Sequence, residues 1–226
     1  MELSIDTSTD WGGLAVSQEG RLVAELVWRP GQNHTSELFP RIDQLLSTAR
    51  TDIKSISAIF VAIGPGSFNG LRAGLSAAKG LAFSLSAPLA GVGTLEIEAY
   101  PFAFTGLPVC AVHDAGRGEL AAALYKQEKA FKCLKAEHLT TLEQLSAEIK
   151  EKTVFCGEIP PADIDKLKKS LGDKAVIPDE SLRIRRPSYL AYLGWQRLQS
   201  GRSDNPAALQ PIYLRQPPIT QRKKRF

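Results

Sequence analysis

A short glycine turn, Gly64-Pro65-Gly66-Ser67-Phe68, contains the first residues whose types and spacing could do chemistry. It joins a predicted strand to a predicted helix, and a glycine turn at a helix start can bind phosphate through its backbone N–H groups. The turn lacks the Gly-Lys-Ser/Thr ending of a P-loop and the glycine spacing of a dinucleotide fingerprint. Ser67 is not in a Gly-x-Ser-x-Gly nucleophile motif and is placed to cap the following helix. The turn therefore favours a structural role.

The three cysteines are the next candidates, as metal ligands or as disulfides. Cys110, Cys133 and Cys156 are odd in number and widely spaced, which disfavours both roles. Free thiols in a reducing cytoplasm are the expected state. The predicted fold begins at Leu3-Ser4-Ile5-Asp6 without a basic leader, and no apolar run approaches the roughly 20 residues of a membrane span. We therefore expect a cytoplasmic protein that does not bind membranes.

Composition and charge bound the class of protein. The 226 residues are enough for one large domain or two small lobes, and 43% apolar with 23% charged residues is typical of a globular protein. The net charge is +4, and basic residues gather at Arg183-Ile184-Arg185-Arg186 and in the tail, residues 221–226. Such segments can contact phosphates, but no aromatic residues are interleaved with them. Contact with nucleic acid stays open.

The elements on either side of the glycine turn must position it. Residues 58–63 form a continuous apolar run, typical of a strand that is covered on both faces. The helix that follows, residues 69–83, contains three glycines, and each costs a helix roughly 1 kcal/mol relative to alanine. We expect these glycines to touch another backbone closely, either in the chain's own sheet or in another protein. The helix has an apolar stripe of Leu71, Leu75, Ala78, Ala82 and Leu85, and a small-residue stripe of Ala73, Ala77, Gly80 and Ser84.

The order of the predicted elements indicates a duplication. The first half is expected to have strands at 3–7, 13–17, 21–28, 58–63 and 89–92, and helices at 37–49, 69–83 and from 94. The second half repeats this order, with strands at 109–113, 119–125, 131–134, 153–156 and 175–177, and helices at 141–152, 163–171 and 188–200. Three strands followed by alternating helices and strands, twice over, indicate an α/β fold of two lobes. The predicted domains are residues 1–105 and 106–226.

Short motifs, met in order along the chain, resemble those of the TsaB (YeaZ) family. They are Ile5-Asp6-Thr7-Ser8, His34-Thr35-Ser36-Glu37-Leu38-Phe39-Pro40-Arg41-Ile42, Gly64-Pro65-Gly66-Ser67-Phe68-Asn69-Gly70-Leu71-Arg72-Ala73-Gly74-Leu75, Asp114-Ala115-Gly116-Arg117-Gly118-Glu119 and Pro211-Ile212-Tyr213-Leu214-Arg215. The glycine stretch is the most specific of these motifs. The departures are small: Asn69 stands where threonine is usual, Thr35 where serine is commoner, and Leu120-Ala121 where an aliphatic residue and a tyrosine are frequent.

The resemblance implies an actin-like (ASKHA) fold with two duplicated ribonuclease-H-like lobes. Members of this family are the dimerisation subunit of the bacterial complex that makes threonylcarbamoyladenosine (t6A) in tRNA. The resemblance further implies a heterodimer with the catalytic paralogue, TsaD, which works alongside the P-loop ATPase TsaE. That complex transfers threonylcarbamoyl to adenosine 37 of tRNAs that read codons beginning with A. The chain would then meet tRNA indirectly, through the complex.

The histidines test whether this chain holds the metal of its catalytic paralogue. The resemblance implies that the paralogue binds its metal through two histidines on one helix, a spacing that puts both rings on one face. Here His34 stands alone, because the residue four positions on is Leu38. His113 and His138 have no histidine partner either. We therefore predict that the metal belongs to the partner.

Two strand-end turns test whether this chain binds a nucleotide. Enzymes of the implied fold hold phosphates with an Asp-x-Gly hairpin in each lobe, whose bare N–H groups bind the anion. The first hairpin, Asp6-Thr7-Ser8, has serine in place of glycine, whereas the second, Asp114-Ala115-Gly116, keeps the glycine but is followed by Arg117. No cofactor is therefore expected to bind firmly to this chain. ATP or ADP at a site shared with the partner stays open, with Asp6, Thr7, Ser8, Asp114 and Gly116 as the weak candidates.

The remaining role is binding through a surface. Both helices after the third strand, 37–49 and 69–83, have apolar stripes that could pair with the matching helices of a paralogue, as the resemblance implies. The expected interface residues are His34, Leu38, Ile42, Leu45, Phe68, Leu71, Arg72, Gly74, Leu75 and Ala78. The alternative is that both helices only cover their own sheet. A surface with pseudo-twofold symmetry can also pair with itself, so we expect a homodimer when the partner is absent.

Two classes of function follow from these residues, a non-catalytic partner subunit or an actin-like enzyme in its own right, either a metallopeptidase or an ATP-dependent phosphotransferase. The missing second histidine and Ser8 favour the partner subunit. We predict that the purified chain contains no stoichiometric metal by mass spectrometry and turns over ATP no faster than a buffer control. Stoichiometric metal or brisk turnover would support the enzyme instead.

Overall fold

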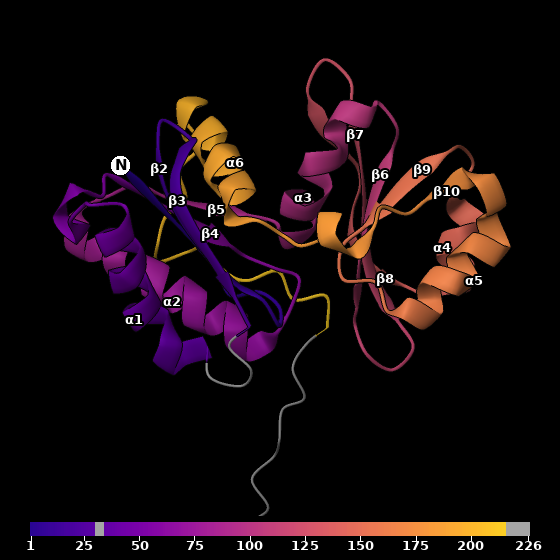
Figure 1. Cartoon of the computed structure of the whole chain (residues 1–226), viewed down its shortest axis with the longest axis horizontal. Coiled ribbons are helices and arrows are strands. Elements are labelled where there is room, and N and C mark those ends of the chain that lie inside the picture. Colours follow the sequence, from indigo (N-terminus) through magenta and orange to yellow (C-terminus); the bar gives the residue numbers. More distant parts are fainter. Residues whose placement is uncertain (30–33, 216–226) are drawn as a thin grey trace, which may run out of the picture.

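Two five-stranded sheets of identical topology form the two lobes of the molecule (Figure 1). The computed structural model describes residues 1–29 and 34–215. The first sheet has the order β3-β2-β1-β4-β5 and the second the order β10-β9-β6-β7-β8. In each, three antiparallel strands are followed by two parallel ones. The predicted duplication of an α/β unit is confirmed.

The bounds of most elements are close to the predicted ones, but β8 continues to Thr140, beyond the predicted end at residue 134, and α4 ends at Glu148, before the predicted end at residue 152. The strands are β1 (Glu2–Asp6), β2 (Gly12–Gln18), β3 (Arg21–Trp28), β4 (Ala58–Ala62), β5 (Leu89–Val92), β6 (Val109–Asp114), β7 (Leu120–Gln127), β8 (Phe131–Thr140), β9 (Thr153–Cys156) and β10 (Ala175–Val176). The helices are α1 (His34–Thr48), α2 (Phe68–Leu85), α3 (Thr94–Ala99), α4 (Leu142–Glu148), α5 (Pro161–Leu171) and α6 (Pro187–Gln199), with short 3-10 helices at Ile53–Ser55, Tyr100–Thr105, Gly172–Lys174 and Glu180–Leu182. In the part of the chain that the structure describes, no helix is both long and apolar enough to cross a membrane.

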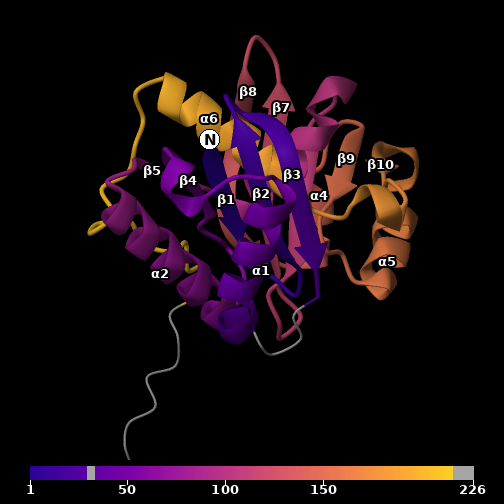
Figure 2. The same ribbon diagram turned by 60° about the vertical axis from the view of Figure 1, so that its left-hand side comes forward.

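The strand β4 shows why the first lobe needs helices on both faces of its sheet. Its residues are buried throughout and alternate between two cores. Ile59 and Val61 face the core beneath α1 and α2, and Phe60 faces the core beneath α6. Figure 2 shows α1 and α2 side by side on the first of these faces. A strand in a parallel sheet is commonly covered on both sides in this way.

The two central helices are exchanged between the halves of the chain. In Figure 1, α3 and α6 lie between the two sheets. Although α6 comes from the second half, its Leu190 and Leu193 pack against Phe60 of the first sheet. Although α3 comes from the first half, its Leu95 packs with Val109 of the second sheet. Each helix thus covers the inner face of the sheet that its own half does not contain.

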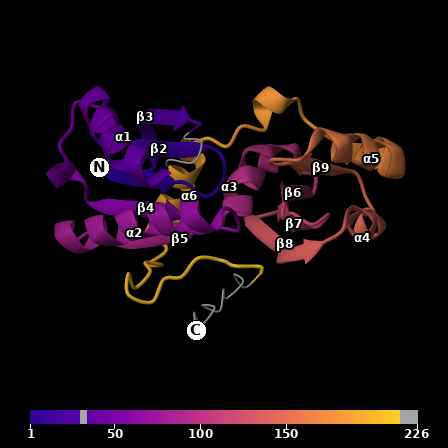
Figure 3. The ribbon, with the colours of Figure 1, turned by 90° about the horizontal axis from the view of Figure 1, so that it is seen from below.

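The predicted domain boundary is therefore wrong for the end of the chain. After α6, Asp204 pairs with Leu89 at the edge of the first sheet, and its carboxylate accepts a hydrogen bond from the Gly91 N–H at 2.7 Å. The Ile212 N–H then donates to the Ile63 carbonyl at 2.7 Å. Figure 3 shows this segment running beneath the first lobe toward the second. Residues 187–212 belong to the first lobe, because its apolar inner face must be covered.

Two of the glycines of α2 lie closely against Thr7 of this chain. A Cβ at Gly70 would lie 2.1 Å from the Thr7 carbonyl oxygen, and one at Gly74 would lie 2.3 Å from Thr7 Oγ1. The Thr7 hydroxyl in turn donates to the Gly70 carbonyl at 2.7 Å. Gly80 differs, because a Cβ there would meet nothing within 4 Å. The first two glycines therefore seat α2 on the turn after β1.

Two helical glycines give a matched test of this packing. Gly194 of α6 lies against Phe60, and a Cβ there would be 2.3 Å from the ring. We predict that Gly194→Ala lowers the free energy of unfolding by about 1–3 kcal/mol, because the buried ring cannot move away. Gly80→Ala, on open surface, should raise it by about 0.5–1 kcal/mol. Denaturant unfolding measures both, and equal effects of the two substitutions would show that α6 does not pack as described.

Candidate functional site

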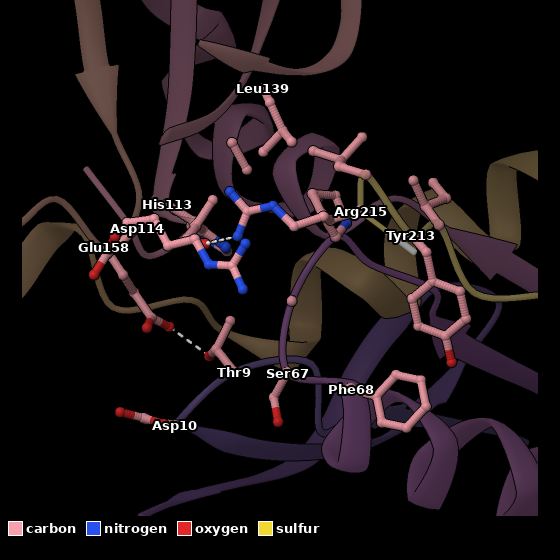
Figure 4. A pocket seen from close by; sticks show the side chains of 17 residues that line it. Thr9, Asp10, Ser67, Phe68, His113, Asp114, Leu139, Glu158, Tyr213 and Arg215 are labelled. Carbon is pink, nitrogen blue, oxygen red and sulfur yellow. Dashed lines mark hydrogen bonds between the residues drawn. The ribbon is translucent and has the colours of Figure 1, made fainter. Parts of the chain in front are cut away.

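A cleft of about 770 Å³ lies between the two lobes. Its walls come from the turns that follow β1, β4, β6 and β9, at the carboxyl ends of these strands, and from residues 212–215. Ligands of open α/β sheets bind at such strand ends. Figure 4 shows Thr9 and Ser67 of the first lobe facing His113 and Asp114 of the second across this space. This cleft is the candidate site.

The polar groups of the turn after β1 are occupied by hydrogen bonds within this chain. The Asp6 carboxylate accepts from the Ser8 N–H at 3.0 Å and from the Ser8 hydroxyl at 2.7 Å. The Ser8 carbonyl accepts from the Ser67 N–H at 2.7 Å. Asp6, Thr7 and Ser8 are all buried. These three candidates for nucleotide binding therefore lie beneath the cleft, and Thr9 and Asp10 reach its surface instead.

The matching turn after β6 is open to the cleft. The exposed Asp114 carboxylate accepts from the Gly116 N–H at 2.8 Å, and Gly116 has a φ of 71°. Arg117 follows with a φ of 60° and lines the cleft. Of the two predicted hairpins, only the second therefore faces the cleft, and Arg117 adds a positive charge beside it.

A buried charge cluster lies at the base of the cleft. The Arg185 guanidinium donates from Nε to Asp6 Oδ2 at 2.5 Å, from Nη1 to Glu98 Oε1 at 2.8 Å and from Nη2 to Thr9 Oγ1 at 2.8 Å. Its Nη1 also lies 3.5 Å from Glu158 Oε1, and Thr9 donates to the same oxygen at 2.5 Å. Only 2% of the Arg185 side chain is exposed. The guanidinium therefore links the first sheet, α3 and the loop after β9.

His113 joins this cluster through Glu98. Its Nε2 lies 2.5 Å from Glu98 Oε2, and both side chains are buried. Burial alone would lower the pKa of His113, and Arg185 acts in the same direction. The Glu98 carboxylate, by its charge and its hydrogen bond, together with Glu158, outweighs them, so the pKa of His113 is raised. His113 therefore has the role of a charge partner to Glu98.

The arginines near residue 185 do not form an exposed basic patch. The Arg183 guanidinium donates to the Pro178 and Gly157 carbonyls at 3.1 and 3.2 Å. Arg186 pairs with Glu25 of β3. Because Arg185 is buried, Arg186 is the arginine of this run that is exposed and available to contact nucleic acid, and such contact stays a prediction. The basic tail, residues 221–226, lies outside the described residues.

An aromatic pair marks one side of the cleft mouth. The rings of Phe68 and Tyr213 have centroids 5.4 Å apart, and the Arg72 guanidinium lies 4.3 Å from the Phe68 centroid. Figure 4 shows the two rings next to each other. Phe68 and Arg72 were expected at a partner surface, and they do lie at the molecular surface. Tyr213 belongs to one of the motifs that resemble the TsaB family, but the sequence did not show that it lies beside Phe68. The chain brings Tyr213 there by returning to the first lobe after α6.

The remaining predicted interface residues are mostly core. Their side chains are at most 5% exposed: Leu38, Ile42, Leu45, Leu71, Leu75 and Ala78. Gly74 faces Thr7, and the side chain of His34 lies outside the described part of the chain. The interpretation of the apolar stripe as a contact seam is thus corrected, because α1 and α2 bury it against their own sheet. Their outer faces carry other residues, including Phe39, 53% exposed, and Phe83, 85% exposed.

Comparison with known proteins decides the family. Residues 29–171 match the family model described as TsaD, tRNA N6-adenosine threonylcarbamoyltransferase. The tRNA threonylcarbamoyladenosine biosynthesis protein TsaB of Bacillus subtilis is 31% identical over 94% of this chain and 93% of its own length. The chain belongs to the TsaB family. The TsaB name links the family to t6A biosynthesis, and the match to the TsaD model shows that this chain is also similar to TsaD.

Solved structures agree on the TsaB fold. A Pseudomonas aeruginosa protein described as similar to the peptidase YeaZ superposes with a TM-score of 0.79 at 25% identity, over 95% of this chain and all of its own. Component A of (R)-2-hydroxyglutaryl-CoA dehydratase from Acidaminococcus fermentans gives a TM-score of 0.53 at 11% identity, over 88% of this chain and 98% of its own. This second likeness concerns the fold alone. The predicted actin-like fold of two duplicated lobes is confirmed.

The pKa of His113 gives a stability test of the charge cluster. A group whose pKa is raised by folding stabilises the protein fully below its unfolded-state pKa, about 6.5, and loses this contribution as the pH rises through the folded-state pKa. We predict that the free energy of unfolding falls between pH 6 and pH 8, and that His113→Gln removes most of this slope. The range stops at pH 8 because burial also raises the pKa of Cys110.

The control for this measurement is His138→Gln. The His138 Nδ1 contacts the Ala136 carbonyl within its own strand at 2.8 Å, and among the described residues no carboxylate contact is found for this ring. This variant should keep the wild-type slope. An unchanged slope in His113→Gln would mean that His113 is not the charge partner of Glu98.

Proposed function

We propose that this chain is the non-catalytic partner subunit of the complex that transfers threonylcarbamoyl to adenosine 37 of tRNAs reading codons that begin with A. Membership of the TsaB family supports the pathway. The observation that carries the non-catalytic role is the state of the turn after β1. Its carboxylate, Asp6, is buried and bound to Arg185 and Ser8, so it offers nothing to a substrate.

The proposed partner is the catalytic TsaD subunit. The match of residues 29–171 to the TsaD model supports this choice, because a shared fold lets two relatives pair through equivalent helices. The TsaD subunit would hold the metal, and the ATPase TsaE would act on the pair. The site of action would be the cytoplasm, where tRNA is modified.

The outer faces of α1 and α2 are the proposed docking surface. Ser76 and Gly80 are exposed on α2, and a Cβ at Gly80 would meet nothing within 4 Å. Small residues on a helix face allow a second helix to approach closely. Phe39 of α1 and Phe83 of α2 supply exposed aromatic area, and aromatic residues are enriched at interfaces. Two helices from each subunit would form a four-helix bundle, and the same face would form a homodimer when TsaD is absent.

A nucleotide at the shared cleft is the weaker part of the proposal. ATP or ADP could meet the N-terminus of α2 at Ser67 and the second hairpin, Asp114 to Gly116, which both line or border the open cleft. The first hairpin cannot contribute in this conformation, since Ser8 is fully buried. The partner would have to supply the missing contacts.

One substitution separates the docking surface from the fold. Ser76→Trp places a bulky ring on the small outer face of α2 and should weaken the affinity for TsaD by at least about tenfold, or roughly 1.4 kcal/mol. Calorimetric titration of the purified subunits measures it. Size-exclusion chromatography of the same variant should show loss of the homodimer.

The matched control is Ser170→Trp on α5. Ser170 is also an exposed helical serine, but it lies on the other lobe. This control should bind TsaD as the wild type does. The docking surface would be misplaced if Ser76→Trp kept wild-type affinity, or if Ser170→Trp lost as much affinity.

A further inference from the structure

Side chains of the kinds that bind metal ions come together at the base of the cleft. One ligand atom each from Glu98, His113 and Glu158 lies within 4.8 Å of the other two. Asp6 adds a third carboxylate, held to the same group through Arg185. Carboxylate oxygens and an imidazole nitrogen are donors that divalent cations use in proteins. By residue type alone, this cluster would be a candidate cation site of the actin-like cleft.

The Arg185 guanidinium already lies among these donors. Its Nη1 is 2.8 Å from Glu98 Oε1 and 3.5 Å from Glu158 Oε1, and its Nε is 2.5 Å from Asp6 Oδ2. The second oxygen of Glu98 is taken by His113 at 2.5 Å. The ligand atoms that a cation would need are therefore bound to nitrogen atoms of this chain. The residues present do not fit a divalent metal while Arg185 stays in place.

Charge and shape both suit a guanidinium in this position. Three carboxylates surround one permanently charged group, whose planar fork donates to several of them at once. Its Nη2 donates to Thr9 Oγ1 at 2.8 Å, and the Thr9 hydroxyl in turn donates a hydrogen bond to Glu158 Oε1 at 2.5 Å. Arg185 reaches this cluster from the segment before α6, whereas Asp6 and Glu98 come from the first half of the chain. The cation is thus brought in by the chain itself.

We propose that Arg185 is a built-in cation, which occupies the carboxylate cluster at the base of the cleft in place of a divalent metal. An ordinary ion pair between the lobes would also bury the arginine. The two interpretations differ in one respect. If Arg185 stands in for a metal, then removing its charge leaves a site that a metal can fill.

The test uses the full-length chain, the Arg185→Met variant and Mn2+ alone as the probe. Thermal unfolding is followed in EDTA and in millimolar Mn2+. In EDTA, Arg185→Met should unfold at a lower temperature than the wild type, because three carboxylates lose their cation. Mn2+ should then raise the unfolding temperature of this variant by about 5–10 °C, as expected when a ligand binds the folded state at about a hundredfold excess over its Kd. The wild type should not respond.

Two further variants act as controls. Arg186→Met removes an adjacent guanidinium that is more than half exposed and pairs with Glu25, so it should respond to Mn2+ no more than the wild type. The double variant Arg185→Met with Glu98→Gln removes one of the donors and should lose most of the Mn2+ effect. Calorimetric titration should give one bound Mn2+ for Arg185→Met and none for the wild type.

Three results would overturn the proposal. The first is equal stabilisation of the wild type and Arg185→Met by Mn2+. The second is a folded Arg185→Met that binds no Mn2+. The third is an Arg185→Met chain that remains unfolded both in EDTA and in Mn2+, because a metal that fits the site should restore the charge balance. None of these readouts depends on whether the chain binds TsaD, so the proposed function can fail separately.

Discussion

The ion pairs of the Arg185 guanidinium link the two halves of this molecule. They join Asp6 at the end of the first central strand, Glu98 on α3 and the Glu158 loop of the second lobe. Breaking a buried ion pair by removing one partner costs about 3–5 kcal/mol, because the remaining charges stay buried and uncompensated. Arg185 therefore contributes a strong polar link to the position of the lobes on either side of the cleft, in addition to the apolar packing of α3 and α6.

The exchange of α3 and α6 makes such a link possible. Each sheet has an apolar inner face that a helix must cover, and in both lobes that helix comes from the other half of the chain. The two crossings bring Glu98 and Arg185 to the same place between the sheets. The cleft then forms where the strands end, with a closed, charge-balanced base and an open rim at the second hairpin.

Periodicity and turn residues predicted most of the fold, because they report local structure. They gave the repeated strand order, the helices α1 and α2 and the cap at Ser67, whose Oγ accepts from the Gly70 N–H at 3.4 Å. They could not show what covers an apolar stripe, so Leu38 and Leu75 were assigned to a partner and proved to be core. They also missed the charge cluster, because Arg185 and Asp6 are 179 positions apart and a run of arginines is usually solvated.

Hydrogen–deuterium exchange of the full-length chain, alone and with the proposed partner TsaD, tests the central claim that this protein acts by binding through α1 and α2. The account predicts slower exchange in the peptides that cover both helices when TsaD is present. Peptides from α4 and α5, on the far side of the second lobe, should exchange at an unchanged rate. Protection confined to the second lobe, with none in α1 or α2, would contradict the account.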